Sequence, residues 1–110
     1  MAYAETLVAL ADPTRRGIYQ RLSRRPHTVG ELARLSGVSQ PAVSQHLRVL
    51  SDARLATHEA DGTRRVYSAS REGLEELRGW IESVWDDALA AYAAADPARR
   101  RRQRAGRRKG

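Results

Sequence analysis

Hydrophobic residues recur three and four positions apart along the first fifty residues, and this spacing predicts a series of short amphipathic helices. The first helix is expected to carry its apolar residues at Leu7, Val8, Leu10 and Ala11. Asp12 and Pro13 follow, and an acidic N-cap before a proline predicts a second helix over about residues 13–22. The buried side of that second helix is expected to consist of Ile18, Tyr19 and Leu22.

Two further helices are predicted on either side of a glycine turn. Thr28 and Glu31 have the spacing of a capping box, so a third helix is expected to start there and to stop at Gly37. Its inward residues would be Leu32, Ala33 and Leu35. Ser39 is expected to cap a fourth helix that ends near residues 51–52, with a core stripe of Val43, Leu47 and Leu50. Two helices joined in this way form a candidate helix-turn-helix.

The period of the pattern changes after the fourth helix. Residues 55–59 and 64–68 alternate in part, and Asp61-Gly62 between them predicts a β-hairpin, because glycine accepts the positive φ of a tight turn. Ser70 is expected to cap a long last helix that ends at Asp96-Pro97. The fold class is therefore mostly α with a small β-hairpin, a winged helix-turn-helix of order α-α-α-α-β-β-α. We expect residues 1–95 to form one DNA-binding and dimerisation domain and residues 96–110 a disordered arginine-rich tail.

The outer face of the fourth helix carries the candidate chemistry. It lacks lysine and glutamate, and its hydroxyl, carboxamide and guanidinium groups suit the edges of DNA bases. The candidates for major-groove contact are Ser39, Gln40, Ser44, Gln45 and Arg48. The candidates for contact by the hairpin, which would act as a wing, are Thr63, Arg64 and Arg65. Each set alone also fits an ordinary polar surface, but together they favour binding of double-stranded DNA.

Charge is segregated along the chain. The chain holds 20 Lys+Arg and 13 Asp+Glu, a formal net charge of +7 at pH 7. Residues 1–95 are neutral overall, since 12 arginines balance 12 acids there, and all of the excess lies in residues 96–110. Within the neutral part, residues 13–65 are basic and residues 66–95 are acidic. We expect the tail either to neutralise DNA phosphates non-specifically or to be a solvated appendage.

The last helix is predicted to be longer than one small domain can cover. About 25 helical residues span about 37 Å, whereas a domain of this size is about 25 Å across. A second copy is therefore expected to cover part of the apolar stripe, and the chain is expected to be a homodimer that reads an inverted repeat. The candidate dimer-interface residues are Leu7, Leu74, Leu77, Ile81, Val84, Trp85 and Ala88.

Several classes of function are disfavoured. Cysteine is absent, which excludes disulfides, thiolate nucleophiles and cysteine metal sites. Neither a glycine-rich phosphate loop nor a nucleophile motif is visible, so we expect no enzyme, no catalytic residue, no cofactor and no metal site. His27 is expected in a loop, His46 at the border of the core and His58 in the wing. The N-terminus does not have the pattern of a signal peptide, and the longest apolar run, 88–95, is too short to span a bilayer. We therefore expect a cytoplasmic protein.

Four segments resemble the ArsR-type winged-helix transcriptional regulators. They are residues 10–16 (LADPTRR), 29–33 (VGELA), 39–50 (SQPAVSQHLRVL) and 62–67 (GTRRVY). The resemblance covers about residues 5–92, and its most specific part is residues 39–50. It implies a homodimer built from the first and last helices, with the fourth helix in the major groove and the wing alongside. It also implies repression at an operator that overlaps a promoter, often the regulator's own.

The chain departs from the metal-sensing members of that family. Their cysteines in the third helix are absent here, and the last helix has carboxylates but no histidine. The sequence is therefore similar to the non-metal branch, in which the last helix often bears tryptophan, as Trp80 and Trp85 do here.

Two alternatives stay open at this stage. One is a protein-interaction or RNA-binding module that uses the winged shape, with the basic tail as its main nucleic-acid contact. The other is a ligand-sensing repressor that holds a small molecule near Trp80 or Trp85. The sequence does not identify an operator, the regulated genes or an effector.

Overall fold

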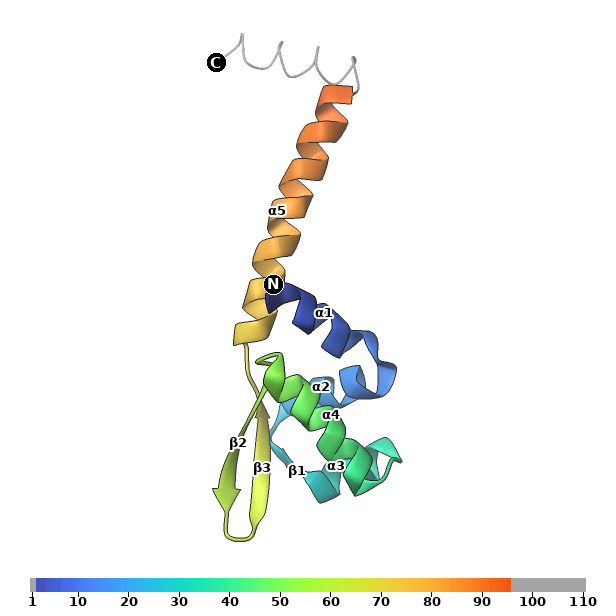
Figure 1. Ribbon diagram of the computed structural model, residues 1–110, viewed down its shortest axis with the longest axis vertical. Coiled ribbons are helices and arrows are strands. Elements are labelled where there is room, and N and C mark those ends of the chain that lie inside the picture. The colour runs from blue at the N-terminus through green and yellow to red at the C-terminus, as the bar shows by residue number, and fades with distance from the viewer. Residues whose placement is uncertain (1, 96–110) are drawn as a thin grey trace. The chain divides into compact units, whose positions relative to one another are not determined.

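The computed structural model describes residues 2–95, and these residues form five helices and three strands (Figure 1). The helices are α1 (Ala2–Ala11), α2 (Pro13–Arg24), α3 (Val29–Ser36), α4 (Gln40–Asp52) and α5 (Glu72–Ala95). The strands are β1 (His27–Thr28), β2 (Ala56–Asp61) and β3 (Arg64–Ala69). The chain divides into two compact units, residues 1–78 and 79–110, and α5 belongs to both. The predicted helix stop at Asp96-Pro97 and the predicted disordered tail lie outside the described residues.

The predicted helix starts are confirmed. The Asp12 carboxylate accepts the N–H of Arg15 at 2.8 Å, and Pro13 opens α2. Thr28 and Glu31 form the expected capping box at the start of α3. The Ser39 hydroxyl accepts the N–H of Ala42 at 3.3 Å at the start of α4. Each cap satisfies N–H groups that have no partner inside the helix, which is why these residues set the boundaries.

The turn between α1 and α2 is held by two arginines of α2. Arg15 Nε donates to the Ala9 carbonyl at 2.6 Å, and its Nη2 donates to the Val8 carbonyl at 3.2 Å. Arg16 Nη1 donates to the Leu10 carbonyl at 3.2 Å. The carbonyls at the C-terminus of α1 lack partners within the helix, so these guanidinium groups cap it.

The three strands form one antiparallel sheet in the order β1-β3-β2. The predicted hairpin is confirmed: Asp61 pairs with Arg64 across a two-residue loop in which Gly62 has a φ of 64°. The loop placement of His27 was wrong, because His27 lies in β1, pairs with Tyr67 and is only 4% exposed. A strand of two residues is too short to show a period in the sequence, and only its pairing with β3 reveals it.

The core of the first unit is formed by α2, α3, α4 and the sheet, and it also includes Ala9 of α1. The predicted inward stripes of α2 and α4 are confirmed as Ile18, Tyr19, Leu22, Val43, Leu47 and Leu50. In α3, Leu32 is fully buried, but the inward prediction for Leu35 was wrong, because that side chain is 46% exposed. Leu35 lies in the last turn of α3, where the neighbouring contact is polar: Arg21 donates to its carbonyl at 3.1 Å.

Of the apolar stripe predicted for α1, Leu10 packs partly buried against the core, while Leu7, Val8 and Ala11 are exposed in this chain. Thr6 and Ala9 are buried, whereas Leu7 and Val8 are 42% and 66% exposed. The small side chains let α1 approach the start of α5 closely, and Thr6 Oγ1 donates to the Gly73 carbonyl at 3.2 Å. The small residues Thr6 and Ala9 therefore form the fully buried positions of α1, and Leu7 and Val8 remain on the surface.

The start of α5 is packed tightly against the end of α4. The Ser70 hydroxyl accepts the N–H of Glu72 at 3.4 Å, so the predicted capping residue acts just ahead of the helix, which begins at Glu72. Gly73 is buried and donates its N–H to the Arg54 carbonyl at 3.0 Å. Arg54 has a φ of 59° and forms an ion pair with Glu76.

Candidate nucleic-acid interface

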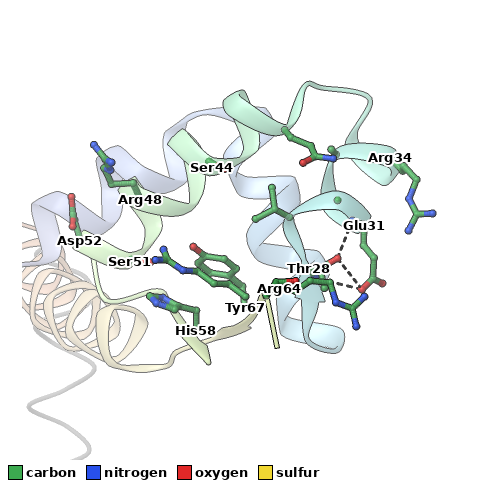
Figure 2. A pocket seen from close by; sticks show the side chains of 16 residues that line it. Thr28, Glu31, Arg34, Ser44, Arg48, Ser51, Asp52, His58, Arg64 and Tyr67 are labelled. Atoms are coloured by element: carbon green, nitrogen blue, oxygen red, sulfur yellow. Dashed lines mark hydrogen bonds between the residues drawn. The ribbon is translucent and has the colours of Figure 1, made fainter. Parts of the chain in front are cut away.

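A groove of about 1110 Å³ lies between α3, α4 and the hairpin of β2 and β3 (Figure 2). Its lining is mostly polar and comes from segments that are far apart in the chain. From α4 it includes Gln40, Ser44, Arg48, Ser51 and Asp52. From the hairpin it includes His58, Thr63, Arg64, Arg65 and Tyr67. The hairpin thus stands beside α4 as a wing, and we call this space the α4–wing groove.

The α4 helix presents a clear division between its two faces. Val43, Leu47 and Leu50 are fully buried, so the opposite face is held outward by the core. Ser44 and Arg48 are exposed, and Figure 2 shows both on the groove side of α4. This division follows from the 3.6-residue period of the sequence, because the apolar stripe fixes the rotation of the helix.

Not all of the predicted α4 residues line the groove. Gln40, Ser44 and Arg48 do, whereas Ser39 and Gln45 are exposed outside it. The Ser39 hydroxyl also accepts the Ala42 N–H as the N-cap. Gln45 lies farther round the outer face of the helix than Ser44, so it points to solvent beyond the groove rim.

All three predicted wing residues line the groove. Thr63 lies in the turn, and Arg64 and Arg65 begin β3. Arg64 Nη2 lies 3.7 Å from Asp61 Oδ2, but both side chains are more than 60% exposed, so solvent screens this ion pair. The structure therefore brings together two sets of side chains that are about twenty residues apart in sequence.

Two aromatic rings form the floor of the wing side. His58 and Tyr67 have ring centroids 5.1 Å apart, with their planes tilted by 41° (Figure 2). Tyr67 is only 8% exposed and pairs through its backbone with His27 and His58. The ring contact joins the two strands of the hairpin to each other, and the pairing of Tyr67 with His27 of β1 joins the hairpin to the rest of the unit.

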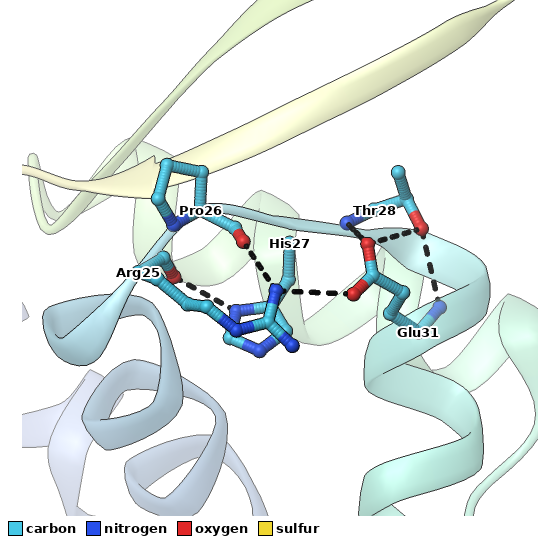
Figure 3. A network of polar contacts seen from close by, with 5 residues as sticks. All are labelled: Arg25, Pro26, His27, Thr28 and Glu31. Carbon is cyan, nitrogen blue, oxygen red and sulfur yellow. Dashed lines mark hydrogen bonds and ion pairs between the residues drawn. The ribbon is translucent and has the colours of Figure 1, made fainter.

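A polar network fixes the α3 side of the groove (Figure 3). Glu31 Oε1 accepts the N–H of Thr28 at 3.3 Å, and Arg25 Nη1 lies 3.2 Å from Glu31 Oε2. The Thr28 N–H and, after it, the Arg25 guanidinium lower the pKa of Glu31 below its ordinary value. In the same way, the Arg15 backbone N–H lowers the pKa of the capping carboxyl of Asp12. Both carboxyls therefore stay ionised at neutral pH and keep their helix starts in place.

His46 lies at the edge of the core stripe of α4, on the side away from the groove residues. It is half-buried, and its Nδ1 lies 3.3 Å from Arg15 Nη1. This position agrees with the prediction that His46 borders the core. Its imidazole is engaged with the arginine that caps α1, which ties α4 to the α1–α2 turn.

Sequence reasoning missed the α3 wall of the groove, to which Thr28, Val29, Gly30, Glu31, Ala33 and Arg34 contribute. Only the capping box of Thr28 and Glu31 was recognised in the sequence. The packing of α3 on α4 is what places them beside Gln40 and Ser44.

The predicted dimer-interface residues behave in two ways within the single chain. Leu77 is buried, at 8% exposure. The others remain exposed, and they are Leu7, Leu74, Ile81, Val84, Trp85 and Ala88. From Gly79 to Ala95 every residue except Ala93 is exposed. An apolar helical stripe of this length is therefore left open to a partner.

The structure also bears on metals and membranes. Among residues 2–95, no group of three or more His, Cys, Asp or Glu side chains is placed to hold a metal ion. No helix in this same stretch has both the length and the apolar character needed to cross a membrane.

The sequence of this chain is similar to those of known proteins. A family described as "Helix-turn-helix domain" matches residues 10–59. The HTH-type transcriptional regulator Rv2034 of Mycobacterium tuberculosis is 54% identical over 85 residues, which cover 77% of this chain and 79% of that protein. The transcriptional repressor SdpR of Bacillus subtilis is 32% identical over 73 residues, covering 66% of this chain and 81% of the repressor.

A solved structure shares the fold. It is the homodimeric winged helix-turn-helix DNA-binding domain of Mb0332 from Mycobacterium bovis, a possible ArsR-family transcriptional regulator. It is 26% identical to this chain, has a TM-score of 0.63, and covers 80% of this chain and 82% of its own. The hairpin beside α4 is therefore a wing in the sense of that fold.

Proposed function

This chain belongs to the ArsR-type winged helix-turn-helix transcriptional regulators, and on that premise we propose that it is a homodimeric repressor of an inverted-repeat operator. The family consists of DNA-binding regulators, so sequence-specific contact with duplex DNA is its central activity. Repression is the activity named for the relative SdpR, and a homodimer is the state named for Mb0332. The operator could overlap the promoter of the repressor's own gene, as the resemblance implies. The repressor would act in the cytoplasm, where its DNA target lies.

The observation that carries this proposal is the α4–wing groove. An α-helix fits the major groove of B-DNA, which is about 12 Å wide. The outward face of α4 carries hydroxyl, carboxamide and guanidinium groups, and the wing adds two arginines beside it. Gln40, Ser44 and Arg48 are our candidates for base contacts, together with Ser39 and Gln45 on the adjoining exposed surface. Thr63, Arg64 and Arg65 are our candidates for backbone or minor-groove contacts.

Dimerisation is proposed through the exposed apolar residues of α1 and α5. The 24 residues of α5 span about 36 Å, and Ile81, Val84 and Trp85 lie on one side of the helix. Leu7, Leu74 and Ala88 would join them, whereas Leu77 is already covered by its own chain. An inverted repeat read by a two-fold pair needs its two α4 helices about 34 Å apart, which is one turn of DNA.

We further propose that residues 1–95 act as one DNA-binding and dimerisation domain. The seven arginines and Lys109 of residues 96–110 would add non-specific attraction to the phosphate backbone. This role needs no particular conformation of the tail, because counterion release depends only on charge near the duplex.

The test is selection of bound fragments from a genomic library, followed by footprinting of the best fragment. We expect an inverted repeat whose half-sites are one helical turn apart and an affinity at least about a thousandfold above that for bulk duplex DNA. Transcription from a promoter that contains the fragment is expected to fall when the protein is added.

Competition distinguishes the proposal from an RNA-binding or protein-interaction role. Unlabelled operator duplex is expected to displace the labelled fragment, while single-stranded RNA of matched length is not. Equal displacement by RNA and by random duplex would show that the chain is not a sequence-specific operator binder.

A further inference from the structure

Most arginines of residues 2–95 are occupied by contacts within the protein. Arg15, Arg16 and Arg21 donate to backbone carbonyls. Four others lie in ion pairs with Glu31, Glu76, Asp61 and Glu75, and these are Arg25, Arg54, Arg64 and Arg71. The arginines that donate to backbone carbonyls serve the fold first, whereas an exposed ion pair such as that of Arg64 is screened by solvent and leaves the guanidinium able to meet a ligand.

Among the described residues, four arginines have no hydrogen-bond or ion-pair partner, and they are Arg24, Arg34, Arg48 and Arg65. Three of these line the α4–wing groove, each from a different element: Arg34 from α3, Arg48 from α4 and Arg65 from β3. Figure 2 shows Arg34 and Arg48 toward opposite ends of the groove. The free guanidinium groups are therefore concentrated on the surface that would meet the ligand.

The freedom of Arg34 has a structural cause. Glu31 lies three residues before it on α3, a spacing at which an acid and an arginine commonly pair. Here both carboxylate oxygens of Glu31 are engaged, Oε1 with Thr28 and Oε2 with Arg25 (Figure 3). The capping network therefore holds the acid that would otherwise neutralise Arg34.

We propose that Arg34 is a phosphate-binding residue, which clamps the DNA backbone from the α3 side while Arg65 does so from the wing. In a helix-turn-helix the first helix crosses the backbone when the second lies in the major groove, so an arginine of α3 meets phosphates and not base edges. A guanidinium matches a phosphate with paired N–H donors. This inference rests on the proposal that the α4–wing groove binds duplex DNA.

The test measures how affinity for a fluorescein-labelled duplex of random sequence depends on salt, between about 50 and 200 mM NaCl. Arg34→Ala is expected to reduce the slope of log K against log salt by about 0.9 per protomer, since one phosphate contact is lost. Arg34→Lys keeps the charge and is expected to restore the slope. Arg24→Ala is the matched control, because Arg24 is equally free and exposed but lies outside the groove.

Thermal unfolding of each variant is the check that the fold is kept. If the wild-type protein binds duplex DNA and the salt slopes of Arg34→Ala and Arg24→Ala are equal, Arg34 does not bind phosphate. This result would leave the proposed function standing. Absence of salt-dependent duplex binding by the wild-type protein would overturn both.

Discussion

At the scale of the residue, Gly73 is the glycine among the described residues at which an added side chain would meet the closest contact. A Cβ at this site would overlap the carbonyl oxygen of Ala53 and press against Leu55. The Gly73 carbonyl accepts a hydrogen bond from the Thr6 hydroxyl, and the Gly73 N–H donates one to the Arg54 carbonyl. The start of α5 therefore cannot move away without breaking these hydrogen bonds. Nothing in the sequence marks this glycine, because its restriction comes from the end of α4 and not from a turn.

Gly73→Ala is expected to lower the free energy of unfolding by about 1–3 kcal/mol, as over-packing of a tight contact does. Gly17→Ala is the matched control. Gly17 lies inside α2, and a Cβ there meets no atom within 4 Å, so alanine is expected to raise stability by about 0.5–1 kcal/mol. Urea unfolding measures both variants. Equal effects of the two changes would contradict the packing described at Gly73.

Glu31 makes the stability of the fold depend on pH. Its pKa in the folded state lies below the ordinary value of 4.5, so its stabilising contribution is complete above about pH 4.5 and is lost as pH falls through the lowered value. Glu31→Gln is expected to be less stable than the wild type at neutral pH, and the difference is expected to shrink toward about pH 3.

Thermal unfolding across this pH range measures the effect of Glu31→Gln. Glu59→Gln is the control, because Glu59 is exposed on β2 and its carboxylate has no partner among the described residues. If the difference in stability between the wild type and Glu31→Gln stayed constant with pH, the Glu31 carboxylate would not contribute to the loss of stability at acidic pH.

At the scale of the element, α4 combines a packed face with an exposed polar face, which we propose contacts DNA. Arg48 is exposed, free of partners among the described residues, and lies on the groove side. Arg48→Ala is expected to weaken binding to the selected operator by about 1–3 kcal/mol if its guanidinium reads a guanine. Binding to random duplex is expected to change less, since most of that affinity comes from phosphates.

Electrophoretic mobility shift with the footprinted fragment and with random duplex measures the Arg48→Ala effect. Arg71→Ala is the control, because Arg71 is exposed outside the groove and pairs only with Glu75. An operator affinity equal to that of the control variant would remove Arg48 from the base-reading set.

The elements differ in how far they were predictable. The starts of α2, α3 and α4 follow from Asp12, Thr28 and Ser39, because a cap and its helix lie within four residues of each other. The hairpin follows from Gly62, whose positive φ suits a two-residue turn. The strand β1 and the burial of Thr6 in α1 were not predicted. They are set by pairing with β3 and by contact with Gly73, both far away in the chain.

At the scale of the whole molecule, the exposed stripe of α5 is the feature that one chain does not explain. Trp85 is 65% exposed, and Ile81 and Val84 beside it are 48% and 43% exposed. Trp85→Glu is expected to raise the dimer dissociation constant by roughly thirtyfold or more, because a buried aromatic anchor is typically worth about 2 kcal/mol or above. Operator affinity is expected to fall with it.

Sedimentation of the protein at micromolar concentration measures how much of it is dimeric. Ser83→Glu introduces the same charge on the opposite side of α5 and serves as the control. A wild-type protein that sediments as a monomer, or a Trp85→Glu variant that sediments as the wild type does, would show that this stripe is not the dimer interface.

The sequence alone determined where helices begin, where the chain turns and which face of α4 is polar. These features depend on residues within about one helical turn of each other, so they can be read along the chain. Tertiary structure alone decided that α3 forms one wall of the groove and that Gly73 must stay a glycine. Both depend on contacts between segments distant in sequence, which no local pattern records. The unpaired state of Arg34 became visible only in the structure too, although its cause is local, because Glu31 is already engaged by Thr28 and Arg25.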